Sequence, residues 1–392
     1  MKKKLFSILL ASALTVGLLS GCGSTSDNSG AGSTEAAGNT AQESQSTTET
    51  AKEKTPLRIL GFNSVIGHID SVIAYTGGYY EEEGIDPQFT YNNSNPDNTQ
   101  ALIEDKADLV SAGATCVIQY IDQGADLVII GGQMSLGETV YALPERADEF
   151  KEFTTETLAG KKVGVSRLNT GDIVFRKILK DKGVDLSQIE FVELDSQATV
   201  TQAVVKGEVD LGINFLTFRQ SAEDMGLVPV SQLDAENEWP DYICCRIFTT
   251  REKLNENRDA YVAAMKANIK AYELIQTDHE KTLEVAQKGI ELDKDVLEDQ
   301  IYNYGHLGLS PNPDVKNSVK FYEAMTDIGY AQGTVDLHDY IDASVYIDAL
   351  NELLAEDPDN EIYKELKVNF QNLEQQIKEL ENLNAEYAIK CD

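Results

Sequence analysis

The chain has 392 residues, and its 66 acidic side chains outnumber the 33 basic ones, which gives a formal net charge of −33 at pH 7. Nucleic acid and anionic lipid both repel so acidic a surface, so the composition excludes a nucleic-acid-binding protein. The five cysteines and four histidines include no Cys-x-x-Cys motif and no zinc-ligand spacing. We therefore expect neither a metal site nor a cofactor.

The first 22 residues have the parts of a secretory signal. Three lysines at positions 2 to 4 precede an apolar run that ends at Leu19 and is too short for a stable membrane span. The run is followed by Ser-Gly-Cys22, which resembles a bacterial lipobox. That resemblance implies a signal peptide over 1–21 and a diacylglycerol, with acyl chains such as palmitate, on Cys22. An ordinary cleaved signal with an incidental cysteine is the alternative.

Residues 22–54 are rich in Ser, Thr, Gly, Ala, Asn, Gln and Glu and contain no aromatic side chain. Such a segment has almost nothing to bury and cannot offset the entropy lost on ordering. It therefore predicts a lipidated, disordered tether that holds a folded part at the outer face of the cell membrane. The fold is expected to begin at the apolar segment 56–60.

About 340 residues remain after the tether, more than one hydrophobic core usually holds, so two lobes are expected. Short apolar runs alternate with longer helical stretches, a pattern typical of an α/β fold with mostly parallel sheets. The predicted strands cover 57–62, 109–111, 127–131, 162–166, 190–193, 211–215 and 242–248. The predicted helices cover 71–84, 99–106, 118–123, 171–182, 198–206, 218–225, 252–276, 280–289, 294–304, 318–328 and 343–354.

Two segments about a hundred residues apart share one pattern. Residues 101–109 and 203–211 each read as a helix end, a turn and an acidic residue directly before a strand. Gly207 is expected to end its helix in a left-handed cap, and Asp108 and Asp210 are expected to begin the strands. The repetition predicts two similar α/β lobes in succession.

Four stretches together resemble one protein family. They are Ala-Tyr-Thr-Gly-Gly-Tyr-Tyr-Glu-Glu-Glu-Gly-Ile (74–85), Leu-Ala-Gly-Lys-Lys-Val-Gly-Val-Ser (158–166), Lys-Gly-Glu-Val-Asp (206–210) and the helix around 260–275. In this order and spacing they resemble the substrate-binding proteins of ABC importers in the nitrate/sulfonate/taurine and thiamine-precursor-synthase-like group. The resemblance implies a two-lobed periplasmic-binding-protein-like (type II) fold with two crossover strands. It places lobe 1 at 55–145 and 247–350, and lobe 2 at 146–246.

Ligands of open α/β sheets bind beyond the carboxyl ends of the strands, where helix N-termini offer free N–H groups. The polar residues of the loops at these ends are the expected ligand-binding residues. They are Asn63, Ser64, His68, Thr115, Gln133, Ser166, Asn169, Thr170, Gly171 and Asn214. Plain turns and helix caps explain several of them equally well. Thiamine-precursor relatives resemble this chain in having a histidine in the loop that contains His68.

The charge and aromatic content of these loops leave the ligand open. Arg167 is the only cation among them, and Asp172 opposes an anion unless it points away. Family members often carry a tryptophan and an acidic residue at 214–218, and this chain departs from that pattern. Phe215 or Trp239 could stack on a planar ligand, although a core position is the commoner role for such aromatic residues.

The remaining cysteines and the C-terminus carry separate expectations. Adjacent residues of a strand point to opposite faces, so Cys244 and Cys245 are expected to face opposite ways. Cys116 and one of this adjacent pair are expected to be buried thiols. Residues 356–392 add a helix with apolar residues spaced alternately 3 and 4 apart, which is a coiled-coil heptad pattern. That stripe fits packing on the body or a helical partner, self-association, or a mobile tail.

The sequence contains no Gly-x-Ser-x-Gly, His-Glu-x-x-His or phosphate-loop motif, so we expect a binding protein and not an enzyme. The interpretation we favour is a lipid-anchored, extracytoplasmic solute-binding component of an ABC importer. It would capture a sulfonate, vitamin precursor or related organic acid between two closing lobes, for delivery to a permease with its ATPase. A lipid-anchored ligand-sensing or adhesive surface module is the alternative.

Overall fold

The structure, a computed structural model, describes residues 53–373 of the chain. Within this range the chain forms two five-stranded sheets and a third sheet of two short strands, as the predicted α/β class requires. No helix in this part of the chain is long and apolar enough to cross a membrane. The predicted signal peptide, Cys22, the tether up to residue 52 and Cys391 lie outside the described residues.

The first sheet has the strand order β2-β1-β3-β11-β4. Strand β1 runs parallel to β2 and β3, whereas β11 is antiparallel to both β3 and β4. The chain therefore leaves this sheet after β4 and returns to it as β11. The strands are β1 (Thr55–Gly61), β2 (Ile85–Tyr91), β3 (Leu109–Gly113), β4 (Leu127–Gly132) and β11 (Cys245–Thr250). The helices of this part are α1 (Ile69–Thr76), α2 (Tyr79–Glu82), α3 (Asn95–Ile103), α4 (Ala114–Asp122), α9 (Arg251–Glu256), α10 (Arg258–Thr277) and α14 (Ser344–Glu356).

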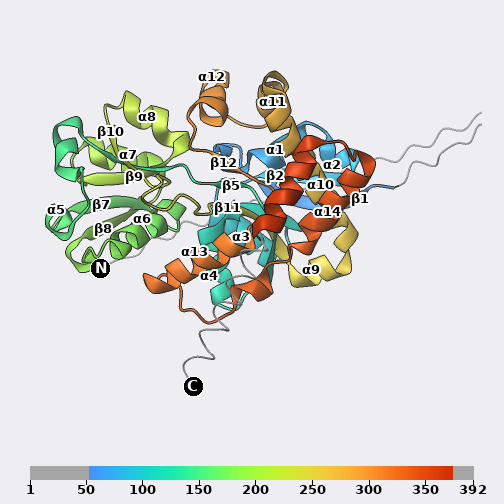
Figure 1. The fold of residues 1–392 in the computed structure, drawn as a ribbon, viewed down its shortest axis with the longest axis horizontal. Helices are drawn as coiled ribbons and strands as arrows, with labels where there is room; N and C mark the ends of the chain where they lie inside the picture. The colour runs from blue at the N-terminus through green and yellow to red at the C-terminus, as the bar shows by residue number, and fades with distance from the viewer. Residues whose placement is uncertain (1–52, 374–392) are drawn as a thin grey trace, which may run out of the picture. The chain divides into compact units, whose positions relative to one another are not determined.

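The second sheet, drawn in green in Figure 1, has the order β10-β6-β9-β7-β8. Strand β7 is parallel to β8 and β9, and β6 is antiparallel to β9 and β10. The strands are β6 (Glu138–Ala142), β7 (Lys162–Ser166), β8 (Glu190–Leu194), β9 (Leu211–Phe215) and β10 (Val228–Gln232). The helices are α5 (Thr155–Leu158), α6 (Thr170–Asp181), α7 (Gln197–Val205) and α8 (Arg219–Asp224).

Short extended segments connect the two sheets. Strand β5 (Met134–Ser135) leads from β4 to β6, and its Ser135 forms an antiparallel bridge with Ile243 on the path back to β11. Strand β12 (Gly308–Leu309) pairs with β5. Because β6 pairs within the second sheet, a boundary drawn from strand pairing falls near β5, ahead of residue 145. The exact limits of the lobes stay a prediction.

The repeated helix–turn–Asp pattern has the same hydrogen bonds in both sheets. Asp108 accepts the backbone N–H of Arg58 (2.9 Å), and Asp210 accepts that of Lys162 (2.6 Å). In each case the aspartate carboxylate holds the backbone of the neighbouring parallel strand. Gly207 ends its helix at φ = 69°, and Asp105 occupies the matching turn position at φ = 57°. The expected repetition of one local structure is confirmed.

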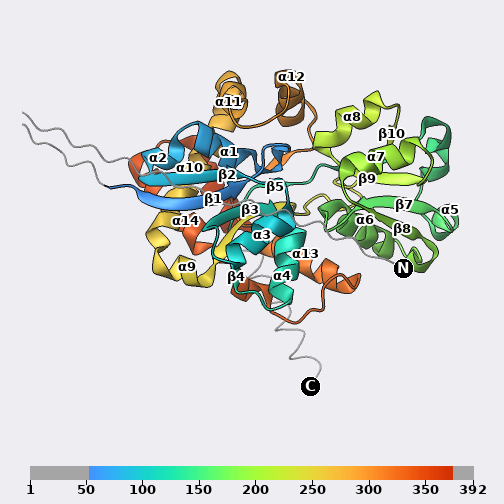
Figure 2. The ribbon, with the colours of Figure 1, turned by 180° about the vertical axis from the view of Figure 1, so that it is seen from behind.

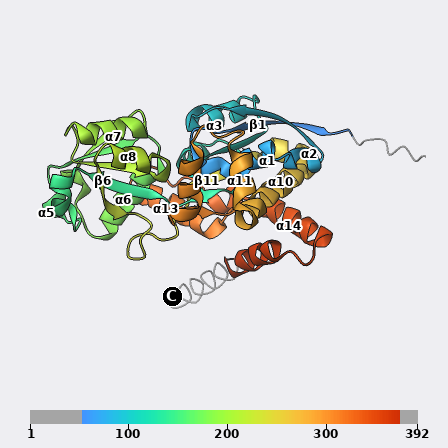
Figure 3. The same cartoon turned by 90° about the horizontal axis from the view of Figure 1, so that it is seen from above.

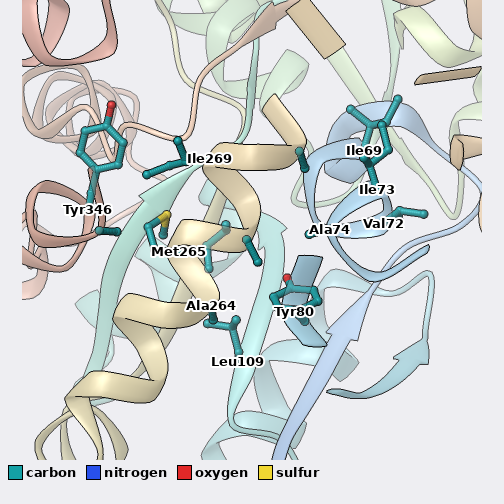
Figure 4. Packing of buried hydrophobic residues seen from close by; sticks show 14 of the residues in the cluster. Ile69, Val72, Ile73, Ala74, Tyr80, Leu109, Ala264, Met265, Ile269 and Tyr346 are labelled. Atoms are coloured by element: carbon teal, nitrogen blue, oxygen red, sulfur yellow. The ribbon is translucent and has the colours of Figure 1, made fainter. Parts of the chain in front are cut away.

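A buried apolar cluster joins the first sheet to the helices beside it (Figure 4). Ile73 of α1, Tyr80 of α2, Met265 of α10 and Tyr346 of α14 are all less than 2% exposed. A second cluster contains residues of both sheets and of α13 (Val315–Asp327), whose Phe321 is completely buried. Helices α11 (His279–Ala286) and α12 (Lys294–Glu298) lie side by side (Figures 1 and 2), and a π-helical turn, Asp299–Asn303, continues α12.

The C-terminal helix begins at residue 361, and its first turns pack on the body. Figure 3 shows this helix next to α14, both in red. The first three residues of the heptad stripe, Tyr363, Leu366 and Phe370, are buried in the first apolar cluster. The Phe370 ring centroid lies 5.8 Å from that of Tyr346. Packing on the body is therefore confirmed for these positions, and the stripe beyond residue 373 lies outside the described range.

Candidate functional site

A cavity of about 320 Å³ is lined by loops of both sheets, and its volume is at the lower end of the range for small-molecule sites. The first sheet supplies residues that follow β1, β2 and β3, and the second supplies residues at the start of β6 and at the ends of β7, β8 and β9. An outer hollow of about 760 Å³ shares Asn93, Asn95, Leu168 and Asp195 with the cavity and so continues from it. A further hollow of about 730 Å³ beside α6 and α13 shares no lining residue with the cavity.

Several predicted site residues lie at this cavity. Ser64 and His68 line it from the loop after β1, and Ser166, Asn169 and Thr170 line it from the turn between β7 and α6. Asn169 caps α6, since its Oδ1 accepts the backbone N–H of Gly171 (2.8 Å). The hydroxyl groups of Ser64 and Ser166 bond to no described residue, so both are free to contact a ligand.

The other predicted residues of the first sheet do not line the cavity. The Asn63 amide donates to Glu291 (2.9 Å) and accepts from Asn93 (2.8 Å), so it joins two loops. Thr115 is completely buried in the first turn of α4, and its hydroxyl has no partner within residues 53–373. Gln133 is 1% exposed and bonds to three side chains, Ser71, Ser111 and His68.

In the second sheet, Gly171 and Asn214 also lie outside the cavity lining. A Cβ atom on Gly171 would lie 2.7 Å from Oε2 of Glu138, so only glycine allows α6 to approach that carboxylate. Asn214 is 1% exposed, and its amide hydrogen-bonds to the Thr201 hydroxyl (2.6 Å). Both residues shape the second lobe behind the cavity wall.

The His68 ring is held in one orientation at the cavity wall. It is 3% exposed and stacks on Phe62 with ring centroids 4.2 Å apart. Its Nδ1 lies 2.5 Å from the Ser111 hydroxyl and 3.2 Å from Gln133 Oε1. Burial lowers the pKa of His68 to about 3, so the ring is neutral. Because the Ser111 hydroxyl donates to the amide oxygen of Gln133, Nδ1 is assigned as the protonated nitrogen, which leaves Nε2 as a hydrogen-bond acceptor.

Glu138, which we did not predict, lies at the floor of the cavity on the first residue of β6. It is completely buried, and neither carboxylate oxygen has a partner within the described residues. Its backbone N–H donates to the Tyr242 hydroxyl (2.9 Å). Burial, with the neighbouring Cys244 and Asp234, raises the pKa of Glu138 well above its usual value, and the adjacent Gly171 N–H offsets this only in part.

Cys244 and Cys245 both line the cavity, with their Sγ atoms 3.4 Å apart. The expectation that they face opposite ways is wrong, because Cys244 precedes β11 and does not have the regular alternation of a strand. Both are buried free thiols, as is Cys116. The hydrogen bond to Cys244, together with burial, raises the pKa of Cys245 well above its usual value.

The charged groups of the cavity are acidic. Glu138 and Asp195 line it, and no lysine or arginine of residues 53–373 does. Arg167, the cation expected nearby, is exposed and lines the outer hollow. Asp172 points away from the cavity toward Arg176, whose Nε donates to it at 2.6 Å. Trp239 has a core position beside Phe321, whereas Phe215 contributes an aromatic face to the cavity.

Comparisons with known proteins identify relatives of the chain. A family model described as "NMT1/THI5 like" matches residues 66–282, which confirms the expected resemblance. A relative from Brucella abortus (strain 2308), whose name describes it only as a binding protein, is 25% identical over 255 residues. The match covers 64% of this chain and 76% of the relative.

Solved structures share the fold. The periplasmic aliphatic sulphonate binding protein SsuA from Escherichia coli matches with a TM-score of 0.62 at 18% identity, over 75% of this chain and 99% of SsuA. The periplasmic nitrate-binding protein NrtA from Synechocystis PCC 6803 matches with a TM-score of 0.64 at 14% identity, over 77% of this chain and 89% of NrtA. At such identities the likeness establishes the fold alone. It confirms the expected two-lobed periplasmic-binding-protein fold.

Proposed function

Because the chain belongs to the NMT1/THI5-like family, we propose that it is the extracytoplasmic solute-binding component of an ABC importer. In this role it captures a small organic molecule between its two lobes and delivers it to a permease, and a separate ATPase subunit supplies the energy. The chain acts by binding and not by catalysis. Fold neighbours that are named as periplasmic sulphonate- and nitrate-binding proteins support the proposal.

The cavity between the sheets is the observation that carries this function. Its polar groups come from both sides, with Ser64 and His68 from the first sheet and Ser166 and Thr170 from the second. A molecule that contacts both sides stabilises the arrangement in which they are close together. The natural hinge for such a movement is formed by the two paths that carry the described chain from one sheet to the other, the segment with β5 and the return from β10 to β11.

The proposal includes the location of the protein. A lipid on Cys22 anchors the chain to the outer face of the cell membrane, and residues 22–54 act as its tether. The heptad positions after residue 373 remain candidates for contact with a helical partner or with a second copy of the chain.

Native mass spectrometry of the full chain, purified without added ligand, tests the capture role. We expect a small molecule that stays bound under native conditions and leaves on denaturation. If the protein is empty, a metabolite panel scored by the rise in melting temperature follows, because a ligand of the folded state raises it. A broad panel without any stabilising compound would contradict the proposal and favour the sensing or adhesive surface module.

A pair of variants assigns the binding to the cavity. Ser64→Ala and Ser166→Ala each remove a hydroxyl that bonds to no described residue, so the empty protein should keep its melting temperature. We expect each variant to lose about 3- to 10-fold in affinity for the identified ligand, the value of one hydrogen bond. Unchanged affinity in both variants would place the ligand elsewhere on the protein.

A further inference from the structure

The cavity is lined by a buried carboxylate, that of Glu138, whose oxygens accept no hydrogen bond from the described residues. Glu138 is completely buried, yet both of its carboxylate oxygens lack a partner within residues 53–373. Buried acids are normally hydrogen-bonded or paired with a cation, because an unpaired one destabilises the fold. Gly171 brings α6 so close that a Cβ atom at this position would meet Oε2 at 2.7 Å. The carboxylate is thus enclosed on the α6 side and lines the cavity on the other.

The rest of the cavity wall, within the described residues, supplies no cationic side chain that could neutralise this acid. The only other charged lining residue is Asp195, and none of the lysines and arginines in the described range reaches the cavity. The neutral His68 presents Nε2, which is an acceptor. An anionic ligand in this cavity would therefore find no lysine or arginine side chain of the described residues to balance its charge.

We propose that Glu138 selects the ligand, and that the ligand is a small organic cation with at least two N–H donors, of the amidinium, guanidinium or ammonium class. This inference rests on the proposed solute-binding function and narrows its substrate class. A planar cation with two parallel N–H groups can pair with both oxygens of one carboxylate. His68 Nε2 is available for a further donor, and Phe215 and Phe218 offer apolar faces to the body of the ligand.

Proton release follows from this pairing. In the empty cavity, burial and the neighbouring Cys244 and Asp234 raise the pKa of Glu138 well above its usual value. Tyr242, which is also buried, and Cys245 face the same group without supplying a positive charge, and His306 lies 2.7 Å from Asp234. A bound cation favours the carboxylate and lowers this pKa, so at a pH where the empty site is protonated the Glu138 proton passes to the solvent on binding. Binding therefore releases up to one proton for each ligand bound.

Isothermal titration calorimetry with matched probes tests the inference on the full chain. A panel of small organic cations, headed by benzamidinium, is compared with anions of similar size, headed by benzenesulfonate. Each titration is repeated in two buffers of different ionisation enthalpy, and the difference in binding heat counts the protons released. The variant Glu138→Gln keeps the shape of the neutral acid and removes the ionisation. Glu145→Gln is the matched control, because Glu145 is exposed in the segment that follows β6.

We expect a cation to bind the wild type and Glu145→Gln with release of up to one proton, and Glu138→Gln to lose at least about 30-fold in affinity. Tight binding of an anion, or equal binding of a cation by Glu138→Gln, would overturn the inference and leave the solute-binding function intact. Cation binding to the wild type without proton release at any pH between about 5 and 8 would also overturn it, and this readout does not depend on any variant. If no compound of either class binds, the inference fails, and the solute-binding proposal is decided by the native mass spectrometry and the broad panel described above.

Discussion

We expect a second buried acid, Asp70, to lower the stability of the protein at neutral pH. Asp70 lies in the first turn of α1 and is completely buried, and neither of its carboxylate oxygens has a partner within residues 53–373. Burial raises its pKa from 3.8 to about 7, although the backbone N–H of the same residue opposes the shift. The side chain faces Tyr80 and Tyr272, and neither tyrosine carries a positive charge that could stabilise the carboxylate.

The sign and size of the effect follow from the linkage of protonation to folding. Between about pH 4 and pH 7 the unfolded chain has released the Asp70 proton while the native protein still holds it, so the free energy of unfolding falls as the pH rises. A shift of about 3 pKa units corresponds to about 4 kcal/mol at 1.36 kcal/mol per unit. Asp70→Asn removes the ionisation. We therefore expect this variant to be more stable than the wild type by up to about 4 kcal/mol at pH 8 and nearly equal to it at pH 4.

Urea unfolding at several pH values between 4 and 8 measures this difference. Asp86→Asn is the control, since Asp86 is an exposed residue of β2, and its stability difference should not change with pH. The reasoning about Asp70 would be refuted by a stability difference that is independent of pH, or by an Asp70→Asn protein that is less stable than the wild type at pH 8.

Three further predictions concern the aspartates that bond neighbouring strands, the C-terminal helix and the cavity thiols. Asp108→Asn and Asp210→Asn should each lower the free energy of unfolding by about 1–3 kcal/mol at pH 7, because each carboxylate bonds the backbone of a neighbouring strand and an arginine side chain. Urea titrations measure this loss, and an unchanged unfolding midpoint would contradict the prediction. Leu366→Ala should lower the free energy of unfolding measured by calorimetry by about 2–3 kcal/mol, whereas Val368→Ala on the same helix, at a position 52% exposed, should lower it little. Equal losses in the two variants would refute the packing of this helix on the body. The adjacent thiols at the cavity should react with a maleimide only after denaturation, as counted by mass spectrometry, and rapid native labelling would show that they are accessible.

Much of the fold could be predicted from the sequence because its central strands are apolar runs between turns. The residues predicted for β7 and β9, 162–166 and 211–215, match the observed strands. Such strands are buried on both faces, so their side chains form continuous hydrophobic segments. The Asp residues that precede β3 and β9 added a second signal, since their carboxylates act on the backbone of the next strand.

The strands that were missed are those whose burial depends on tertiary structure. Strand β2 is an edge strand that contains Pro87 and alternates between buried and exposed positions, so it has no continuous apolar run. Strand β6 begins with Glu138, a residue that ordinary patterns place at the surface. The predicted helix 71–84 is interrupted because Gly78 adopts φ = 84° and separates α1 from α2.

The site could be predicted in part. Ser166, Asn169 and Thr170 were found because a strand followed by a helix start places its polar groups at the sheet edge. The same rule failed for Gln133, whose side chain turns inward to bond Ser71, a residue far away in the sequence. Glu138 was missed because one carboxylate among 66 acidic residues carries no local signal. The lack of hydrogen-bond partners for Glu138 follows from the tertiary packing of α6 beside it, which the sequence pattern does not reveal.

The two unpartnered acids have different consequences for the protein. Asp70 does not line the cleft cavity, so its burial destabilises the native state without a contact that a ligand could supply. Glu138 lines the cavity, where a bound cation would stabilise the ionised carboxylate and strengthen binding. Both Asp70→Asn and Glu138→Gln should therefore raise the stability of the empty protein, but only Glu138→Gln should lose ligand affinity. If both variants lost affinity equally, the acids would act through the general stability of the lobes, and the selective role of Glu138 would be wrong.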